Sequence, residues 1–217
     1  MYQGQQPQQP LPGAYYGPAV PPKQAKSCST AIKILIAAMI LLGVLVIVLW
    51  LALRPSDIKF RVTSASLAQF NLTSSPGDGN NNLLYNLTTV VSIRNPNKRV
   101  GVYYDWLEAT AEFEGERFAW TPLPSFYQGH KNTTTLYPSF AGSSVIDLSG
   151  SDMRDFGMQQ QAGAFEVTLR LRARYRFKIR SIKTRRTTMK VRCYLTVPRA
   201  GTGRSFSETK CKVDVDW

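Results

Sequence analysis

The arginines and lysines between positions 170 and 192 are the residues of this chain that point most clearly to a chemical function. This stretch holds eleven basic residues and no acidic one, and a cation occupies every second position from Arg170 to Arg180. Guanidinium and ammonium groups bind phosphate, sulfate and carboxylate groups. We therefore expect an anion-contacting face. Its candidate residues are Arg170, Arg172, Arg174, Arg176, Lys178, Arg180, Lys183, Arg185 and Arg186.

The alternative interpretation of these cations is structural, because a charged outer face keeps a β-sheet soluble and discourages edge pairing. The formal net charge is +13, and Lys23, Lys26 and Lys33 are the only charged residues before the long apolar segment, so +10 belongs to the residues beyond it. An anion-binding role favours anionic lipid head groups, an acidic polysaccharide or an acidic protein. Nucleic acid is not an expected partner outside the cell.

Three cysteines offer redox or acylation chemistry. Cys193 and Cys211 fall on the apolar sides of two predicted strands, so an oxidising compartment would allow a disulfide between them. Two reduced core cysteines are the alternative. Cys28 lies just before the apolar segment, a usual position for reversible palmitoylation, and an unmodified thiol fits the pattern equally well.

Glycosylation is the remaining modification that the sequence suggests. The pattern Asn-X-Thr occurs three times beyond the apolar segment, at Asn71, Asn86 and Asn132. Glycans on these asparagines would require that this part of the chain enters the secretory compartment and faces outward.

A catalytic set is not evident. The chain has one histidine, His130, and lacks CxxC, HExxH and GxSxG patterns, so we expect no catalytic residue, no metal site and no cofactor. Glu112, Glu114 and Glu116 alternate as on the solvated edge of a strand. A carbohydrate-active enzyme with two carboxyl groups stays open as an alternative.

An apolar segment divides the chain that carries these groups. Residues 34–53 are twenty uncharged residues in a row, which as an α-helix would be about 30 Å long, the thickness of a bilayer core. We predict a disordered Gln/Pro/Gly/Tyr-rich cytosolic tail at 1–30, a transmembrane helix at 31–54 and an extracytoplasmic domain at 55–217. The flanking positive charges do not decide the orientation. The sequons and cysteines favour a cytosolic N-terminus.

The segment 55–217 shows the patterns of a β-rich domain. From Phe165 to Ile179 the odd positions are apolar and most even positions are basic, which predicts a strand with one buried and one cationic face. Residues 58–70 alternate irregularly, and further one-sided apolar patterns, separated by turn residues, occupy 85–93, 189–197 and 211–217.

One short helix interrupts this series. Residues 149–161 predict it, with Ser149 or Ser151 as the N-cap. Many short strands joined by turns favour an antiparallel β-sandwich of the fibronectin type III or immunoglobulin kind, preceded by a single transmembrane α-helix.

Three segments carry a resemblance to a known family. The first begins Asn95-Pro96-Asn97 and continues to Tyr103-Tyr104-Asp105. The second begins Pro124-Ser125-Phe126-Tyr127-Gln128-Gly129 and continues to Thr133, and the third is the basic run from Arg174 to Lys178 and on through Lys190 to Cys193. Together, in this order, they resemble the plant NDR/HIN-like family, whose outer domain is of the late-embryogenesis-abundant group 2 type.

The motifs also have a physical interpretation. The asparagines around Pro96 are expected to cap nearby amides at a turn. We expect Phe126 and Tyr127 to attach a loop between the sheets to the core, and Gly129 to permit its turn. The sharper alternative is a ligand site built on aromatic and imidazole side chains, namely Tyr103, Tyr104, Tyr127 and His130.

The resemblance implies a plasma-membrane protein linked to pathogen defence, a seven-stranded sandwich and no catalytic residues. It makes acidic wall polysaccharide a natural partner beside anionic lipid and acidic protein. Our first hypothesis is a membrane-tethered interaction module. The second is a membrane-associated protein that protects against water loss.

Overall fold

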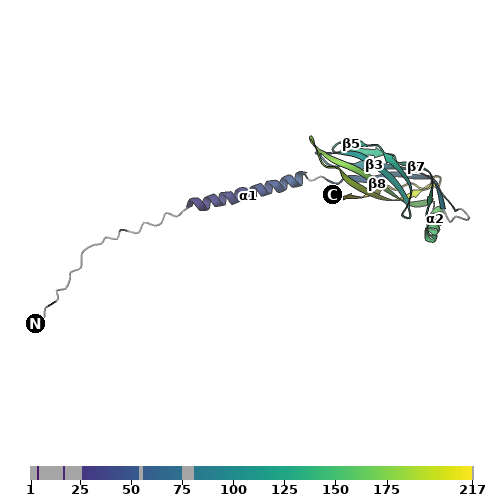
Figure 1. The fold of residues 1–217 in the computed structure, drawn as a ribbon, viewed down its shortest axis with the longest axis horizontal. Coiled ribbons are helices and arrows are strands. Elements are labelled where there is room, and N and C mark those ends of the chain that lie inside the picture. The colour runs from purple at the N-terminus through teal and green to yellow at the C-terminus, as the bar shows by residue number, and fades with distance from the viewer. Residues whose placement is uncertain (1–3, 5–16, 18–25, 54–55, 75–80, 217) are drawn as a thin grey trace. The chain divides into compact units, whose positions relative to one another are not determined.

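The computed structural model describes residues 4, 17, 26–53, 56–74 and 81–216. The chain divides into two compact units, residues 1–54 and 55–217 (Figure 1). Most of the predicted tail, residues 75–80 and Trp217 lie outside the described residues.

Helix α1 (Lys26–Leu53) contains the predicted apolar segment. Residues Thr30 to Leu51 are long and apolar enough to cross a membrane, with a mean hydropathy of 3.2, and the structure buries none of their side chains. A helix that is apolar on all sides matches a lipid solvent rather than a core on one side. Cys28 lies near the start of α1, and its side chain lies outside the described part.

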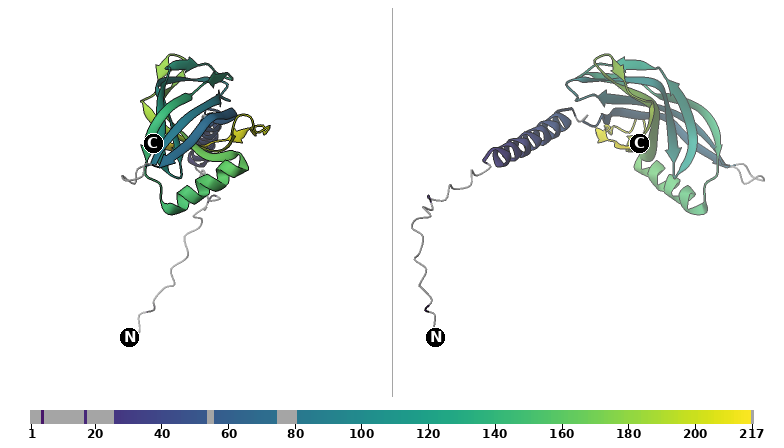
Figure 2. Two further views of the ribbon diagram at one scale, coloured as in Figure 1. Left: turned by 90° about the vertical axis from the view of Figure 1, so that its right-hand side faces the viewer. Right: turned by 60° about the vertical axis from the view of Figure 1, so that its left-hand side comes forward.

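The second unit is a sandwich of two antiparallel sheets, as predicted (Figure 2). Sheet A has the order β11-β1-β2-β6, with β7 also paired to β2. Its strands are β1 (Lys59–Ser74), β2 (Asn81–Arg94), β6 (Thr133–Leu136), β7 (Ser139–Ile146) and β11 (Thr209–Lys210).

Sheet B has the order β12-β10-β8-β3-β4, with β5 paired to β3 and β9 paired to β8. The two sheets together have twelve strands in the described part of the chain, whereas the family resemblance implies seven. Several of the twelve are only two to four residues long. The strands of sheet B are β3 (Val100–Phe113), β4 (Glu116–Leu123), β5 (Phe126–Gln128), β8 (Ala164–Ile179), β9 (Ile182–Lys183), β10 (Thr187–Pro198) and β12 (Lys212–Asp216).

One hydrophobic core fills the space between the sheets. On β8 the odd positions from Phe165 to Tyr175 are buried, which confirms the predicted period of two. The pattern on β1 is irregular because its pairing with β2 shifts between Val62 and Ser64 and again between Leu67 and Gln69. Such bulges move the next buried residue one position along the strand.

Helix α2 (Gly150–Ala162) lies against one end of the sandwich (Figure 2). Ser149 is its N-cap, as predicted: its hydroxyl accepts the Asp152 N–H, and the Asp152 carboxylate accepts the Ser149 N–H. These hydrogen bonds hold the pKa of Asp152 below its ordinary value. The buried ring of Phe156 packs against Phe70 and Phe165 and so attaches the helix to the core.

The Asn95-Pro96-Asn97 motif fixes the point at which the chain enters the sandwich. The side chain of Asn95 is fully buried, accepts the Asn97 N–H and donates to the carbonyls of Val100 and Gly129. Asn97 exchanges two hydrogen bonds of 2.6 and 2.9 Å with the backbone of Ser56. The predicted capping role is confirmed and extends to the first residues of the domain.

The segment 124–129 differs from the prediction. It contains β5, which belongs to sheet B, and the chain crosses to sheet A only after Gln128. Phe126 stacks on Tyr104, but Tyr127 is 46% exposed and does not enter the core. The left-handed turn residue is Lys131, with φ of 50°, and not Gly129.

A disulfide joins Cys193 to Cys211, as predicted, with 4.3 Å between their Cα atoms. Cys211 lies where the chain passes from β11 in sheet A to β12 in sheet B. Its N–H donates to the Phe60 carbonyl on β1, while its sulfur is bonded to β10. The crosslink therefore ties the two sheets together.

Candidate functional site: the outer face of sheet B

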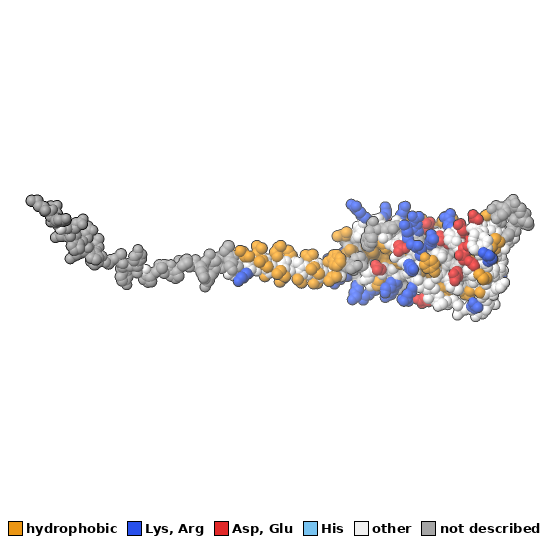
Figure 3. Space-filling view, turned by 90° about the horizontal axis from the view of Figure 1, so that it is seen from below, with side chains coloured by type: hydrophobic (Ala, Val, Ile, Leu, Met, Phe, Trp, Pro, Cys, Tyr) orange, Lys and Arg blue, Asp and Glu red, His pale blue; other side chains and the backbone are white. Residues whose placement is uncertain are grey.

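The predicted basic residues lie along β8 and just beyond it. Arg170, Arg172 and Arg174 point out of sheet B and are exposed, while Arg176 and Lys178 are partly covered. Beyond β8, Arg180 occupies a turn, Lys183 lies in β9 and the next two arginines follow it. Figure 3 shows Lys and Arg side chains gathered over one part of the β domain. We call the outward side of β8 from Arg170 to Lys178, with Lys183, Arg185 and Arg186 after it and Lys190 and Arg192 of β10, the cationic face.

Several cations on this face lie directly opposite one another on neighbouring strands. The register pairs Arg170 with Arg192, Arg172 with Lys190, and Lys178 with Lys183. Like charges in such positions repel and destabilise a sheet. On its other side, β8 pairs with β3, where Glu108 lies opposite Arg172.

Acidic residues from other strands neutralise part of the face. The guanidinium of Arg176 and that of Arg186 each lie 3.0 Å from the carboxylate of Asp105, and Arg192 lies 2.9 Å from Asp214. The stretch 170–192 contains no acid, so its own sequence could not reveal these partners. Among the described residues Arg172 makes no ion pair, and the guanidinium of Arg174 lies over the Trp106 ring, 5.7 Å from its centroid.

The prediction that Glu112, Glu114 and Glu116 form one solvated strand edge is wrong. The chain turns at Glu114 and Gly115, so Glu112 and Glu116 lie on different strands, and the Glu112 side chain is buried rather than solvated. The Nη2 atom of Arg170 lies 2.8 Å from Oε2 of Glu112, but without hydrogen-bond geometry, and this buried oxygen has no hydrogen-bond partner among the described residues. Burial raises the pKa of Glu112, although Arg170 opposes the effect.

Two tyrosines extend the cationic face. The rings of Tyr103 and Tyr127 pack at 4.5 Å on adjacent strands β3 and β5. Lys183 lies 5.0 Å from the Tyr103 centroid and Lys178 lies 5.4 Å from the Tyr127 centroid. Arg176 also lies 5.6 Å from Tyr103. This tyrosine pair is an aromatic platform with cations around it, which suits a ligand that has both flat and anionic parts.

The four residues of the predicted aromatic and imidazole ligand site do not form one site. They are Tyr103, Tyr104, Tyr127 and His130. Tyr104 points into the core, where its hydroxyl donates to Gln128 Oε1 at 3.5 Å and burial raises its pKa. His130 is exposed in the loop after β5. Only Tyr103 and Tyr127 come together on the surface.

Comparison with known proteins places these features in a family. A family model described as late embryogenesis abundant protein matches residues 90–193. NDR1/HIN1-like protein 10 of Arabidopsis thaliana is 42% identical over 86% of either chain. NDR1/HIN1-like protein 3 of the same organism is 36% identical over 94% of this chain and 98% of its own. The chain belongs to the NDR1/HIN1-like family.

The match with a protein from Archaeoglobus fulgidus, known from a crystal structure, covers 66% of this NDR1/HIN1-like chain and 98% of that protein's chain. The sequence identity is 13% and the TM-score is 0.26. That score supports no conclusion about this chain. The resemblance carried by the three sequence motifs is confirmed by the family matches. The matched range 90–193 includes the segments that begin at Asn95 and at Pro124 and all of β8.

The sequons of this NDR1/HIN1-like chain lie in two different settings. Asn71 and Asn86 are half-buried positions within β1 and β2. Asn132 is exposed in a loop, where its side chain accepts the N–H of Thr133 at 2.8 Å. Glycosylation of all three stays a prediction, and Asn132 is the most accessible acceptor.

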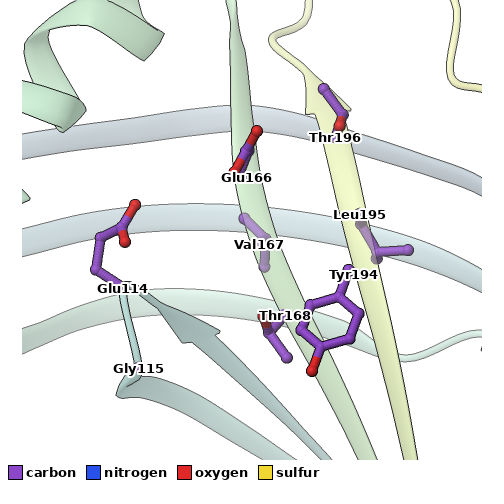
Figure 4. Close-up of a pocket in the computed structure, with 8 residues that line it drawn as sticks. All are labelled: Glu114, Gly115, Glu166, Val167, Thr168, Tyr194, Leu195 and Thr196. Atoms are coloured by element: carbon purple, nitrogen blue, oxygen red, sulfur yellow. The ribbon is translucent and has the colours of Figure 1, made fainter. Parts of the chain in front are cut away.

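A pocket of about 300 Å³ opens beside the β3–β4 turn (Figure 4). Its lining includes the two carboxylates of Glu114 and Glu166 and the ring of Tyr194. Gln159 of α2 connects its walls, since its amide donates to Glu114 at 3.4 Å and its carbonyl accepts the Glu166 N–H at 2.8 Å. Sequence reasoning missed this site, because its carboxylates lie 52 positions apart. In the described part of the chain no three His, Cys, Asp or Glu side chains gather as a metal site.

Proposed function

We propose that this chain is a single-pass, non-enzymatic plasma-membrane protein of plant defence or stress responses that binds an acidic partner through its cationic face. The names of its relatives, NDR1/HIN1-like and late embryogenesis abundant protein, support the biological setting. The apolar segment of α1 supports membrane anchoring. The sequons and the Cys193–Cys211 disulfide support a cytosolic N-terminus and an outer β domain.

The register of like charges on β8 and β10 carries this proposal. Arg172 faces Lys190, and Arg170 faces Arg192, on the same side of sheet B. Glu112 and Asp214 neutralise Arg170 and Arg192, and Glu108 pairs with Arg172 from β3, on the other side of β8. A surface that only needed solubility would gain nothing from opposed like charges, whereas an anion bound between them would stabilise the sheet.

The direct test uses the full chain in nanodiscs and polygalacturonate, an acidic polysaccharide, with neutral dextran as the comparison polymer. We expect polygalacturonate to bind, the affinity to fall steeply as salt concentration rises, and dextran not to bind. Arg172→Gln combined with Arg174→Gln should weaken binding several-fold.

The matched control removes the same number of charges from positions that already have a carboxylate partner. Arg170→Gln combined with Arg176→Gln should weaken binding less, because these guanidinium groups contact Glu112 and Asp105. Equal losses in the two double variants would mean that net charge alone governs binding. Binding that persists at high salt would exclude an electrostatic role for the face.

Topology has its own test. Right-side-out vesicles treated with protease should lose the β domain and keep the N-terminal tail. Glycosidase should lower the mass of the chain, and Asn132→Gln should remove the one glycan attached at that position. Protection of the β domain together with an unchanged mass would overturn the outward orientation.

Two alternatives make different predictions. A protein that protects against water loss should preserve vesicles during drying even with the Arg172→Gln and Arg174→Gln changes. A carbohydrate-active enzyme should depend on the pocket in Figure 4, so Glu114→Gln or Glu166→Gln would abolish cleavage of a polysaccharide. We expect no cleavage by the unchanged protein.

A further inference from the structure

A small hairpin at the end of β8 presents exposed isoleucines that the acidic-partner proposal does not use. Strands β8 and β9 are joined by Arg180 and Ser181, and Arg180 adopts a left-handed conformation with φ of 53°. The register pairs Ile179 with Ile182 next to the turn. Ile182 is 73% exposed and Ile179 is 36% exposed, so the tip presents an apolar pair to the surroundings.

The hairpin is a defined element. Thr184 donates its N–H to the Phe177 carbonyl at 2.9 Å, and its hydroxyl accepts the Phe177 N–H at 2.9 Å. These bonds hold the register that brings the two isoleucines together. The two exposed isoleucines therefore lie side by side at a fixed position on the surface.

The isoleucines are surrounded by positive charge. Residues 178–186 include five basic residues and no acidic one. Only Arg186 of these forms an ion pair with a described residue, Asp105. The exposed ring of Tyr127 lies next to Lys178. An apolar tip with basic and tyrosine side chains around it matches the boundary between lipid head groups and acyl chains.

The position of the hairpin in the sandwich agrees with a membrane contact. Ile179 pairs with Val100, and Lys59 at the start of β1 pairs with Arg94, so the hairpin lies at the end where the chain enters the domain. Exposed Lys98 and Arg99 lie at the same end. The opposite end is acidic and includes Glu114, Glu116, Asp152 and Asp155. In Figure 3 basic side chains gather toward one end of the β domain and acidic ones lie mostly toward the other.

The covalent connection also limits the distance to a bilayer. Ser56 is fixed to Asn97 by two hydrogen bonds, and α1 ends at Leu53. In the sequence only positions 54 and 55 separate Leu53 from Ser56, so a membrane-spanning α1 would leave little chain between the bilayer and the domain.

From these observations we infer that the β8–β9 hairpin is a membrane-contact element, in which Ile179 and Ile182 enter the head-group region and the neighbouring cations bind lipid phosphates. This inference rests on the membrane anchoring in the proposed function. It gives the hairpin a role separate from that of Arg172 and Arg174, which remain available to a soluble acidic partner.

The test uses the full chain with Cys28→Ser, reconstituted in nanodiscs, and an environment-sensitive fluorophore attached through Ile182→Cys. Val145→Cys is the matched control, because Val145 is 65% exposed and lies at the acidic end of the sandwich. We expect a blue-shifted emission and several-fold stronger quenching by lipid-borne nitroxides at position 182 than at position 145. Lys178→Gln with Lys183→Gln should reduce both effects, and thermal unfolding checks that each variant is folded.

The lipid composition and the anchoring are tested separately. The shift at position 182 should increase when phosphatidylglycerol is added to phosphatidylcholine nanodiscs. Water-like emission at both positions, in a protein that resists carbonate extraction, would overturn the hairpin inference alone. If carbonate extracted the protein from the membrane, the membrane anchoring on which the inference rests would be wrong. A shift caused by polygalacturonate and not by lipid would assign the hairpin to the acidic polymer instead.

Discussion

Gly101 lies directly beneath the ring of Tyr127. A Cβ atom at position 101 would come within 2.8 Å of Cε2 in that ring, which is too close for two carbon atoms. The tyrosine ring can therefore lie across β3 and pack on Tyr103 only because position 101 has no side chain. This contact connects the first and second sequence motifs and explains why a glycine precedes the Tyr103-Tyr104 pair.

Gly101→Ala should displace the Tyr127 ring. The ring is partly exposed and can swing outward, so we expect the free energy of unfolding to change by less than about 1 kcal/mol, below the usual cost of overpacking a closed core. Polygalacturonate binding should weaken if the tyrosine platform contacts the ligand. Ring-proton NMR shifts of Tyr103 and Tyr127, together with binding curves, measure the two effects.

Gly129→Ala provides the control for this prediction. A Cβ atom at position 129 would meet no atom within 4 Å, and its backbone does not have the positive φ that disfavours alanine. We expect unchanged ring shifts and unchanged binding. Equal effects of the two substitutions would show that the contact between Gly101 and Tyr127 does not organise the platform.

Asp105→Asn should raise the affinity for an acidic ligand while lowering stability. The Asp105 carboxylate accepts hydrogen bonds from Arg176 and Arg186, both at 3.0 Å. Loss of its charge leaves two guanidinium groups that repel each other and are free to bind an anion. Binding titrations at several salt concentrations and thermal unfolding would report the opposite directions of the two changes.

Asp214→Asn adds the same charge at the edge of sheet B, next to Arg192. It should raise affinity less than Asp105→Asn if ligand binds near the tyrosine platform. Equal gains would locate the ligand elsewhere or show that only the total charge matters.

Local patterns predicted the elements that depend on neighbours in the sequence. The alternation on β8 and the Ser149 cap of α2 are properties of short segments, and both are confirmed. The hairpin strand β9 was not predicted, because two residues are too few to show a period. The irregular pattern on β1 has its cause in bulges, which depend on how β2 pairs with it.

For the same reason, only part of the candidate site could be predicted from the sequence. The cations of β8 follow from the sequence, but the acids that neutralise them come from distant strands. Asp105 lies 71 positions from Arg176 and 81 from Arg186. Which cations remain available to a ligand therefore depends on strand order and register, which a single sequence does not reveal.

The disulfide should contribute strongly to stability. Cys193→Ala combined with Cys211→Ala should lower the free energy of unfolding by about 3 kcal/mol, the usual effect of closing a loop of this length. The loss is expected because Cys211 connects both sheets through its N–H and its sulfur. Denaturant unfolding of the full chain in nanodiscs measures it, and Cys28→Ala, which lies outside the β domain, should have no effect. A double variant as stable as the original would contradict a stabilising role.

Glu112 should give stability a distinctive dependence on pH. Burial raises its pKa above the ordinary value of 4.5, so the folded state holds this proton more tightly than the unfolded state. The proton's contribution to stability is complete below pH 4.5 and disappears as pH rises through the folded pKa. Above that pH the protein keeps a buried carboxylate whose Oε2 has no hydrogen-bond partner among the described residues.

Glu112→Gln removes the titration and keeps the shape of the side chain. The stability of the variant relative to the original should therefore increase from pH 4 to pH 7, as the original loses the contribution of its proton. Denaturant unfolding of both proteins at a series of pH values measures this difference. A relative stability that falls with rising pH would mean that Arg170 outweighs burial and that the ion pair stabilises the charged form of Glu112.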